Sequence, residues 1–397
     1  MSSGPVSGGQ TAWRRQSFSG KAAITGVGMT ELSRDSGTSV LALARQACRA
    51  AIDDAGLTAG DVDAVLSYHL DDSVPVGYLA SALRLPDPVW SNEFYGGGTQ
   101  CASILADAAM LIDSGTARAV LVYRALNGRS GKRMGQTALR IGAGAEAQFS
   151  LPHGMLGPVH LFALAAQRWM YETGATEADL AAVVRHSRRH ASRNPRAVFR
   201  EPLTLDDYLA TPLVATPLRR VDCCLESDGA VALVVARTDV ADSTRPGSPR
   251  VHTVVRGGGP GTSEMDRAPD VERLFSSYLA APLYARAGMS PRDIDLALIY
   301  DAYSWVVPVQ LEDFGLVSRG EAGAFFRDGG ADDDGRLPVN PHGGLLSEGY
   351  VHGLNNIAEA VRQLRGEAVA NQVRDPSVAL CTGFGGSLGS AAILVRP

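Results

Sequence analysis

The sequence predicts an α/β protein that is built from two related halves. Its 397 residues exceed one ordinary hydrophobic core, which favours two domains or two similar halves. Short apolar stretches alternate with helical periodicity, an order typical of layered strands and helices. The stretch AIDDAGLTAGDVDAVL (residues 51–66) is echoed by LYARAGMSPRDIDLAL (residues 283–298). Each contains a helix end, an Ala-Gly pair and an aspartate-flanked strand, which indicates internal duplication.

The first half is expected to cover residues 21–245, after a disordered tail at residues 1–20. This tail is rich in Ser and Gly and lacks the apolar segment of a signal peptide. Strands are predicted at residues 22–32, 61–69, 117–125 and 225–237, and helices at residues 39–57, 96–115, 157–174 and 177–193. The regular alternation is lost at about residues 126–175, where we expect an inserted loop region that includes the helix at 157–174.

The second half is expected to cover residues 246–397. Residues 250–259 are predicted to form a strand that runs into glycines, and residues 293–304 a strand that leads into a loop. Helices are predicted at residues 270–288 and 353–366, and a closing strand pair at residues 378–395. Glycines follow several of these segments and serve as turn or stop signals. The order strand, helix, strand therefore opens both halves.

Composition and charge exclude several classes of protein. The net charge is −5 and the pI is about 5.9, so no nucleic-acid partner is expected. Five cysteines without CxxC spacing predict neither a disulfide framework nor a structural zinc site, and a reducing cytoplasm fits them. No apolar run of 18 residues occurs, so no membrane span is expected.

The stretch LPVNPHGGLLSEGYVHG, residues 337–353, is dense in Gly, Pro, Asn and His. Glycines at this density let a backbone approach a ligand closely. Tyr350 stands in the middle of the stretch, between Gly349 and Val351. The pattern predicts a ligand loop that presents a phenol.

Several ordered blocks of the chain resemble the thiolase superfamily, in its sterol-carrier-protein-X or lipid-transfer-protein branch. The blocks are AITGVGMTEL, TPLRRVDCCLESDGAVALVV, DIDLALIYDAYSWVVPVQLEDFGLVSRGEAGAFF, LPVNPHGGLLSEGYVHG, QLRGEAVANQV and CTGFGG. They span about residues 21–397. The resemblance implies a five-layered αβαβα fold of two repeated halves, usually assembled as a homodimer.

Thiolases use a nucleophilic cysteine thiolate together with a histidine in a Gly-His-Pro loop. Alignment by resemblance places Gly98 at the nucleophile position, with Cys101 about one helical turn further on. Tyr350 replaces the loop histidine, and Tyr300 in IYDAYS replaces a second histidine of the sterol-carrier branch. Cys381 is displaced from the second cysteine position. These departures argue against Claisen chemistry.

The same replacements resemble the lipid-transfer-protein aldolases of bacterial steroid side-chain degradation. This resemblance implies retro-aldol cleavage of a β-hydroxyacyl-CoA, in particular a 17-hydroxy steroid C22-oyl-CoA, to a 17-ketosteroid and propionyl-CoA. It implies acid–base catalysis by Tyr300 and Tyr350, without a covalent intermediate or a bound cofactor. It also implies a partner of the DUF35 type, which contains an OB-fold and a zinc ribbon.

A free phenol has a pKa of about 10 and needs neighbours that favour its phenolate form. His352 and His342 are candidate donors, whereas Asp301 would act in the opposite direction. The backbone N–H groups that bind the enolate oxygen are sought in three glycine loops. These loops contain Gly97 and Gly98, Gly343 and Gly344, and Gly385 and Gly386.

Two other classes of function stay open. One is a thiolase, an acyl-CoA acetyltransferase, that uses Cys101 or Cys381, and the other is a non-catalytic carrier of CoA or lipid. The tyrosines could also simply fill the wall of a cleft. His186 and His190 are spaced i, i+4 on one helix, but no Glu lies between them as in the HExxH motif. The neighbouring arginines make an exposed face the expectation, and no metal site is predicted.

Overall fold

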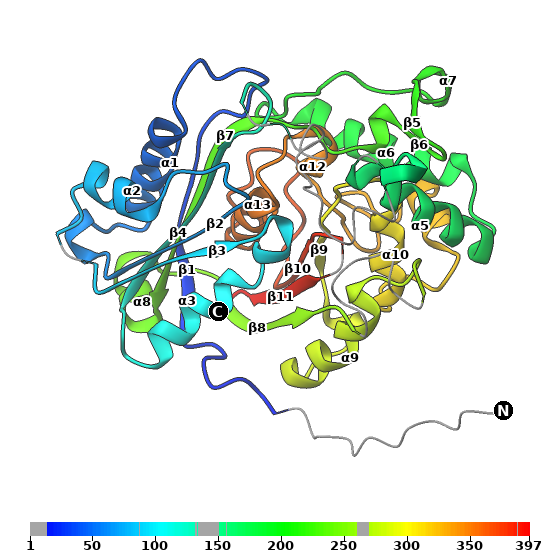
Figure 1. Cartoon of the computed structure of the whole chain (residues 1–397). Helices are drawn as coiled ribbons and strands as arrows, with labels where there is room; N and C mark the ends of the chain where they lie inside the picture. The colour runs from blue at the N-terminus through cyan, green and yellow to red at the C-terminus, as the bar shows by residue number, and fades with distance from the viewer. Residues whose placement is uncertain are drawn as a thin grey trace.

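The computed structural model describes residues 14–86, 88–131, 133, 151–155, 157–259, 270–386 and 388–397 (Figure 1). The strands are β1 (Ala22–Met29), β2 (Ala64–His69), β3 (Trp90–Tyr95), β4 (Ala119–Asn127), β5 (Leu213–Ala215), β6 (Leu218–Arg219), β7 (Asp228–Arg237), β8 (Arg250–Gly257), β9 (Leu296–Leu298), β10 (Val378–Phe384) and β11 (Gly389–Val395). The α-helices are α1 (Val40–Asp54), α2 (Val76–Leu83), α3 (Ile104–Asp113), α5 (Pro158–Thr173), α6 (Glu177–Arg193), α7 (Leu205–Ala210), α8 (Thr238–Thr244), α9 (Phe275–Ala287), α10 (Val306–Asp313), α11 (Ala322–Arg327), α12 (Gly344–Ser347) and α13 (Leu354–Arg365).

The strands of the two halves follow the same order. The large sheet runs β3-β2-β4-β7-β1-β8-β11-β10-β9. In the first half β2 and β4 are parallel, whereas β7 is antiparallel to both β4 and β1. In the second half β9 and β10 are parallel, whereas β11 is antiparallel to both β10 and β8. The order β2-β4-β7-β1 therefore matches β9-β10-β11-β8, and β1 meets β8 at Ala23 and Arg250.

The helices lie in layers around these strands (Figure 1). Helices α1 and α2 cover the outer face of the first-half strands, and α9 packs on β8 and β11 of the second half. Helices α3 and α13 contact strands of both halves and form the central layer. The five-layered αβαβα thiolase-like fold is thus confirmed. Among the described residues, no helix has the length and apolar character needed to cross a membrane.

The two aspartate pairs detected in the sequence form equivalent hydrogen bonds in the two halves. Asp61 and Asp293 close capping boxes with Thr58 and Ser290, in the short 3₁₀ turns that follow α1 and α9. Asp63 accepts from the backbone N–H groups of Arg118 and Ala119, where β4 begins. In the same way, Asp295 accepts from Ser377 and Val378, where β10 begins. The second aspartate of each pair therefore anchors the neighbouring parallel strand.

The structure bears on three of the predicted segments. The tail predicted at residues 1–20 extends too far, because Gln16 exchanges two hydrogen bonds with Val254 of β8 and Phe18 is buried. Residues 1–13 lie outside the described residues. Within the predicted loop region at about 126–175, residues 134–150 also lie outside them, and α5 is formed as expected. Residues 293–304 form a strand that leads into a loop, as expected: β9 ends at Leu298, and Tyr300 lies in the loop after it.

Candidate active site

The two predicted catalytic tyrosines meet in the interior of the protein. The hydroxyl oxygens of Tyr300 and Tyr350 lie 2.7 Å apart, which is hydrogen-bond distance. Their rings meet edge to face with centroids 6.3 Å apart. Tyr300 is 1% exposed and Tyr350 is 6% exposed. Two residues that are 50 positions apart in the sequence thus form one buried phenol pair.

Tyr300 is held by the end of β9 and its neighbours. Its backbone N–H donates to Oγ1 of Thr382 on β10 at 2.8 Å, and its carbonyl accepts from the Gln310 side chain of α10 at 2.9 Å. Thr382 in turn donates to Gln310 at 2.7 Å. Because these partners are themselves buried, the backbone of Tyr300 has little freedom to move.

Glycines provide the space that the Tyr300 ring occupies. A Cβ atom at Gly98 would lie 2.1 Å from Cζ and 2.2 Å from the hydroxyl oxygen of Tyr300. A Cβ atom at Gly353 would lie 2.8 Å from the same ring. Both distances are shorter than a van der Waals contact between heavy atoms, which is about 3.5–4.0 Å. The thiolase resemblance places a cysteine at position 98. Because Gly98 has no side chain, the Tyr300 ring can occupy the space that a cysteine side chain would take.

The loop that carries Tyr350 is positioned by Asp301. The buried Asp301 carboxylate accepts from the backbone N–H groups of Leu345 and Leu346 at the start of α12. Gly344 is required there, since its φ is +62° and a Cβ atom would lie 2.1 Å from the Asp301 carboxylate. Burial raises the pKa of Asp301 to about 6. Asp301, adjacent to Tyr300 in the chain, thereby ties the two tyrosine segments together.

The segment 222–227 runs between the two tyrosine-bearing segments. Cys223 forms a bridge with Tyr303, and Glu226 forms a bridge with Tyr350. The backbone N–H of Tyr350 donates to Oγ of Ser227 at 3.2 Å. This segment therefore contacts both of the tyrosine-bearing segments.

A buried arginine that sequence reasoning missed lies behind Tyr350. Arg124 on β4 is 0% exposed and forms an ion pair with Asp72 at 2.6 Å. Its Nε donates to Nδ1 of His352 at 3.0 Å, and the His352 ring packs edge to face on Tyr350 with centroids 4.8 Å apart. Sequence does contain a signal for this residue, because Arg124 interrupts the otherwise apolar run AVLVYRALN. A buried charge needs a partner, which makes such a residue a candidate site residue.

His352 has a defined tautomer because of Arg124. A guanidinium group can only donate, so Nδ1 of the neutral His352 ring accepts and Nε2 carries the proton. Burial, followed by the Arg124 charge, lowers the pKa of His352 to about 3, which keeps the ring neutral. Its Nε2–H has no hydrogen-bond partner among the described residues and lies against Gly97. The site therefore holds one unused buried donor beside the tyrosine pair.

The two tyrosines differ in their electrostatic surroundings. Burial raises the pKa of both phenols well above the ordinary value. For Tyr350, Cys224 and Asp72 add to this rise in the pKa, whereas the hydrogen bond with Tyr300 and the Arg124 cation act in the opposite direction and favour the phenolate. For Tyr300, the neighbouring Tyr350 raises the pKa further. The pair therefore favours a negative charge on Tyr350 over one on Tyr300.

The cysteine thiols near the pair have properties opposite to those of a nucleophile. Cys101 and Cys381 are both 0% exposed. Burial raises the pKa of Cys101 to about 12, and burial also raises the pKa of Cys381. The Cys101 thiol contacts the Thr382 carbonyl at 3.6 Å. A catalytic thiolate needs a lowered pKa and access to substrate, and neither thiol has them.

The remaining predicted residues divide between the site and its support. Gly97 and Gly98 lie against His352 and Tyr300, and Gly385 packs on Thr99 beside them. Gly386 lies next to Gly385 with φ +102°. The N–H of Gly343 is taken by the Asn340 carbonyl, and Gly343 packs on Ala191 of α6.

His342 is separate from the tyrosine pair. Its Nε2 contacts the Asn356 side chain at 3.1 Å and lies 3.7 Å from Glu348. No described hydrogen bond joins it to either tyrosine.

A cavity of about 430 Å³ lies elsewhere, beside the C-terminus, and is lined by Arg245, Arg365 and Arg396. None of its lining residues belongs to the tyrosine cluster.

The prediction of an exposed His186–His190 face is wrong. His186 and His190 are 3% and 0% exposed, and Arg188 is also buried, over the Phe199 ring. The physical reason is that α11 and the aspartate-containing loop after it pack on this side of α6. Only Arg185, Arg189 and Arg193 remain at the surface.

Fold and site together define a class of protein: a thiolase-like scaffold with a buried tyrosine pair, in which the Tyr300 ring occupies the space beside Gly98. Comparison with known proteins agrees. A family model described as Thiolase C-terminal domain-like matches residues 262–396. The chain is 39% identical over 369 residues to 17-hydroxy-3-oxo-4-pregnene-20-carboxyl-CoA lyase of Mycobacterium tuberculosis, covering 89% of this chain and 93% of that protein.

Two further similarities are more specific. The chain is 39% identical over 393 residues to the steroid side-chain-cleaving aldolase of Thermomonospora curvata, covering 94% of this chain and 98% of that protein. A solved structure named Ltp2-ChsH2(DUF35) aldolase matches with a TM-score of 0.89 and 36% identity over 96% of this chain and 99% of its own. The chain belongs to the thiolase superfamily, in the lipid-transfer-protein branch that contains these aldolases. It is a carbon–carbon lyase.

Proposed function

We propose that the protein cleaves a β-hydroxyacyl-CoA by a retro-aldol reaction in which Tyr300 and Tyr350 act as the acid–base pair. The observation that carries the proposal is the 2.7 Å contact between their hydroxyl oxygens, in a space created by Gly98. A pair of coupled phenols can share one proton, as paired carboxylates do, and so hold a base and an acid side by side.

The electrostatic difference between the phenols supports separate roles. Tyr350, as phenolate, takes the proton of the tertiary hydroxyl, and the Cα–Cβ bond breaks to give a ketone and a thioester enolate. Tyr300 then donates its proton to the enolate carbon. The proton on Tyr350 moves across the hydrogen bond to Tyr300 and restores the starting state. Proton and charge balance over the cycle, and no covalent adduct with the enzyme is needed.

The enolate oxygen requires a donor that does not have to reorganise. Nε2–H of His352 suits this role, since it is buried, neutral and without a partner among the described residues. The adjacent Gly97 allows close approach, because a Cβ atom there would lie 3.1 Å from the His352 ring. His342 is left to support the loop.

The substrate and partner are inferred from the relatives. We infer a 17-hydroxy steroid C22-oyl-CoA as substrate, with a 17-ketosteroid and propionyl-CoA as products, because two relatives at 39% identity are named for steroid substrates. A DUF35 partner is supported by the name of the Ltp2-ChsH2(DUF35) aldolase structure. Acyl-CoA is the substrate, and the proposed steps use no bound cofactor.

A homodimer is supported by an edge of the sheet. Strand β3 pairs only with β2 among the described strands, and its outer residues Trp90 and Tyr95 are 48% and 68% exposed. An exposed edge strand with large apolar side chains is a template for pairing with another chain. A second copy of the protein suits this edge, and light scattering of the purified chain measures the assembly.

The test is turnover of the steroid β-hydroxyacyl-CoA by the chain with its DUF35 partner, with chromatographic detection of the ketone and of propionyl-CoA. Tyr350→Phe is expected to lower kcat by about 10²–10⁴-fold, the usual contribution of a general acid or base. Tyr171→Phe is the matched control, because Tyr171 is 79% exposed on α5. Near-normal turnover by folded Tyr350→Phe contradicts the proposal.

The same assay separates the alternatives. A thiolase would cleave a 3-ketoacyl-CoA only when free CoA is added, and iodoacetamide would abolish its activity. A carrier would bind acyl-CoA without any turnover in the presence of the partner. The buried Cys101 and Cys381 thiols lead us to expect aldolase turnover that iodoacetamide does not inhibit.

A further inference from the structure

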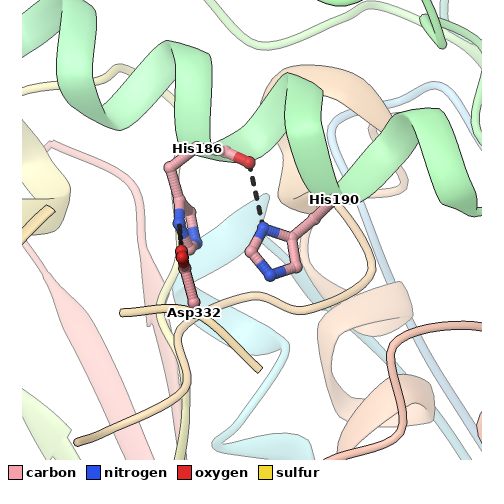
Figure 2. Close-up of side chains that lie close together, drawn as sticks. All are labelled: His186, His190 and Asp332. Carbon is pink, nitrogen blue, oxygen red and sulfur yellow. Dashed lines mark hydrogen bonds and ion pairs between the residues drawn. The ribbon is translucent and has the colours of Figure 1, made fainter. Parts of the chain in front are cut away.

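A cluster of histidine and carboxylate groups lies between α6 and the loop after α11, outside the site described above. His186 and His190 occupy one face of α6, and Asp332 approaches them from the loop (Figure 2). The ligand atoms of these three residues all lie within 4.8 Å of one another. Nδ1 of His186 is 3.3 Å from the Asp332 carboxylate, and Nε2 of His190 is 3.5 Å from that of Asp333.

The outer nitrogen of each ring is fixed by a backbone carbonyl. Nε2 of His186 lies 2.8 Å from the Val339 carbonyl, and Nδ1 of His190 lies 3.0 Å from the His186 carbonyl. Carbonyl oxygens only accept, so both of these nitrogens must carry protons. In a neutral ring the other nitrogen then presents a lone pair. The two lone pairs face carboxylates, which are also acceptors.

This arrangement leaves two buried nitrogens, His186 Nδ1 and His190 Nε2, without a hydrogen-bond partner among the described residues. Buried polar groups are normally satisfied, and an orphan often marks a missing ion or water. Histidines that bind metals typically donate the other ring N–H to a carbonyl or carboxylate, which orients the lone pair.

We propose that His186 Nδ1, His190 Nε2 and the Asp332 carboxylate bind a divalent transition-metal ion of the zinc type. Two imidazole nitrogens, a carboxylate and a water form a common tetrahedral ligand set. Bonds of about 2.1 Å place such ligands about 3.4 Å apart, so the His186–Asp332 pair already has this spacing. His190 needs a shift of at most about 1.4 Å. This departs from the sequence-based expectation of no metal site.

Two arginines at the surface are expected to affect the affinity of the cluster for a metal ion. Arg189 pairs with Asp332, and Arg193 pairs with Asp333 at 2.9 Å. Their side chains are 52% and 48% exposed, so they can turn into solvent when a metal neutralises the carboxylates. Their positive charge also opposes a cation in the cluster. Removal of the Arg189 charge should therefore tighten metal binding.

The ion would join α6 to the segments that carry the tyrosine pair. Val339, whose carbonyl accepts the His186 hydrogen bond, lies in the loop that carries Tyr350 and bridges to Ala297 of β9. The next residue, Asn340, exchanges hydrogen bonds with both backbone groups of Ile299, adjacent to Tyr300. A metal at this position would stabilise both tyrosine segments without touching either phenol.

The experiment titrates the metal-free full chain, without tag histidines, with Zn²⁺ by calorimetry, and with Co²⁺ by visible absorption. We expect one ion per chain, the absorption of a tetrahedral Co²⁺ site, and a rise of about 2 °C or more in the unfolding midpoint with Zn²⁺. Asp332→Asn and His190→Asn should each weaken binding at least ~100-fold. Asp334→Asn, an exposed aspartate of the same loop, should bind as the unchanged chain does.

Arg189→Gln keeps all three ligands and should tighten Zn²⁺ binding about fivefold. This variant keeps the test decisive if a ligand substitution prevents folding. His69→Asn controls for adventitious binding, since His69 lies beside two other carboxylates, Asp71 and Glu93. Absence of stoichiometric binding, or equal binding by Asp332→Asn and Asp334→Asn, overturns the proposal. The short His186–Asp332 distance would then be explained by a proton shared between the two side chains.

Discussion

Gly98→Ala tests the link between the glycine at the nucleophile position and the tyrosine pair. The added Cβ would lie 2.1 Å from Cζ of Tyr300, whereas carbon atoms in contact are about 3.5 Å apart or more. The ring must therefore retreat by about 1.4 Å, which breaks the 2.7 Å contact with Tyr350. We expect a loss of about 10²-fold in kcat, as for a misplacement of about 1 Å at a reacting group. Overpacking should also lower the free energy of unfolding by about 1–3 kcal/mol.

The assay compares ketone release by Gly98→Ala, Tyr300→Phe and the double variant, with urea unfolding of each. If Gly98→Ala acts through the Tyr300 hydroxyl, it should lower kcat little further in the Tyr300→Phe background. Gly77→Ala is the matched control, because Gly77 lies in α2 with open space around it. That variant should keep full activity and gain roughly 0.5–1 kcal/mol. Near-normal kcat in Gly98→Ala, or equal losses in both backgrounds, would refute the reasoning.

Three further predictions concern charged groups. Arg124→Gln removes the cation that favours the Tyr350 phenolate, so the ascending limb of the pH–kcat/KM profile should move to higher pH. If the limb does not move, Arg124 does not influence the protonation of the catalytic base. Asp63→Ala and Asp295→Ala each remove the acceptor of two backbone N–H groups, so each should lower the free energy of unfolding, measured with urea, by about 1–3 kcal/mol. Very unequal losses would argue against an equivalent role for the two aspartates. Burial raises the pKa of Asp313 to about 6, so the folded state keeps this proton up to a higher pH than the unfolded chain and loses stability as pH rises from about 4 to about 6. Asp313→Asn should therefore raise the free energy of unfolding by up to about 3 kcal/mol at pH 7.5 and have little effect at pH 4, whereas a pH-independent effect would point to packing instead.

Local patterns in the sequence were sufficient for the duplication. The repeated Ala-Gly and aspartate pairs lie within stretches of 16 residues, and their hydrogen bonds confirm that both copies do the same work. Strand and helix positions could be predicted from periodicity because that pattern, too, lies within a short stretch of the chain. The edge strand β3 and the short helix α12 were missed, because neither has a long periodic pattern. Residues 16–20 were placed in a tail because their contacts with β8 are made far away in the sequence.

Through its resemblance to the thiolase superfamily, the sequence predicted the thiolase-like fold of two halves, a glycine at position 98 where a cysteine is expected, and tyrosines at positions 300 and 350 where histidines are expected. Those features depend on residue type and order. Only the tertiary structure decided that the two hydroxyls meet at 2.7 Å and that Arg124 reaches His352 across 228 positions of sequence. It also decided that His186 and His190 are buried. The reason is physical: burial, pKa and hydrogen-bond partners are set by segments distant in the chain, and a local pattern carries no information about which segment will pack on it.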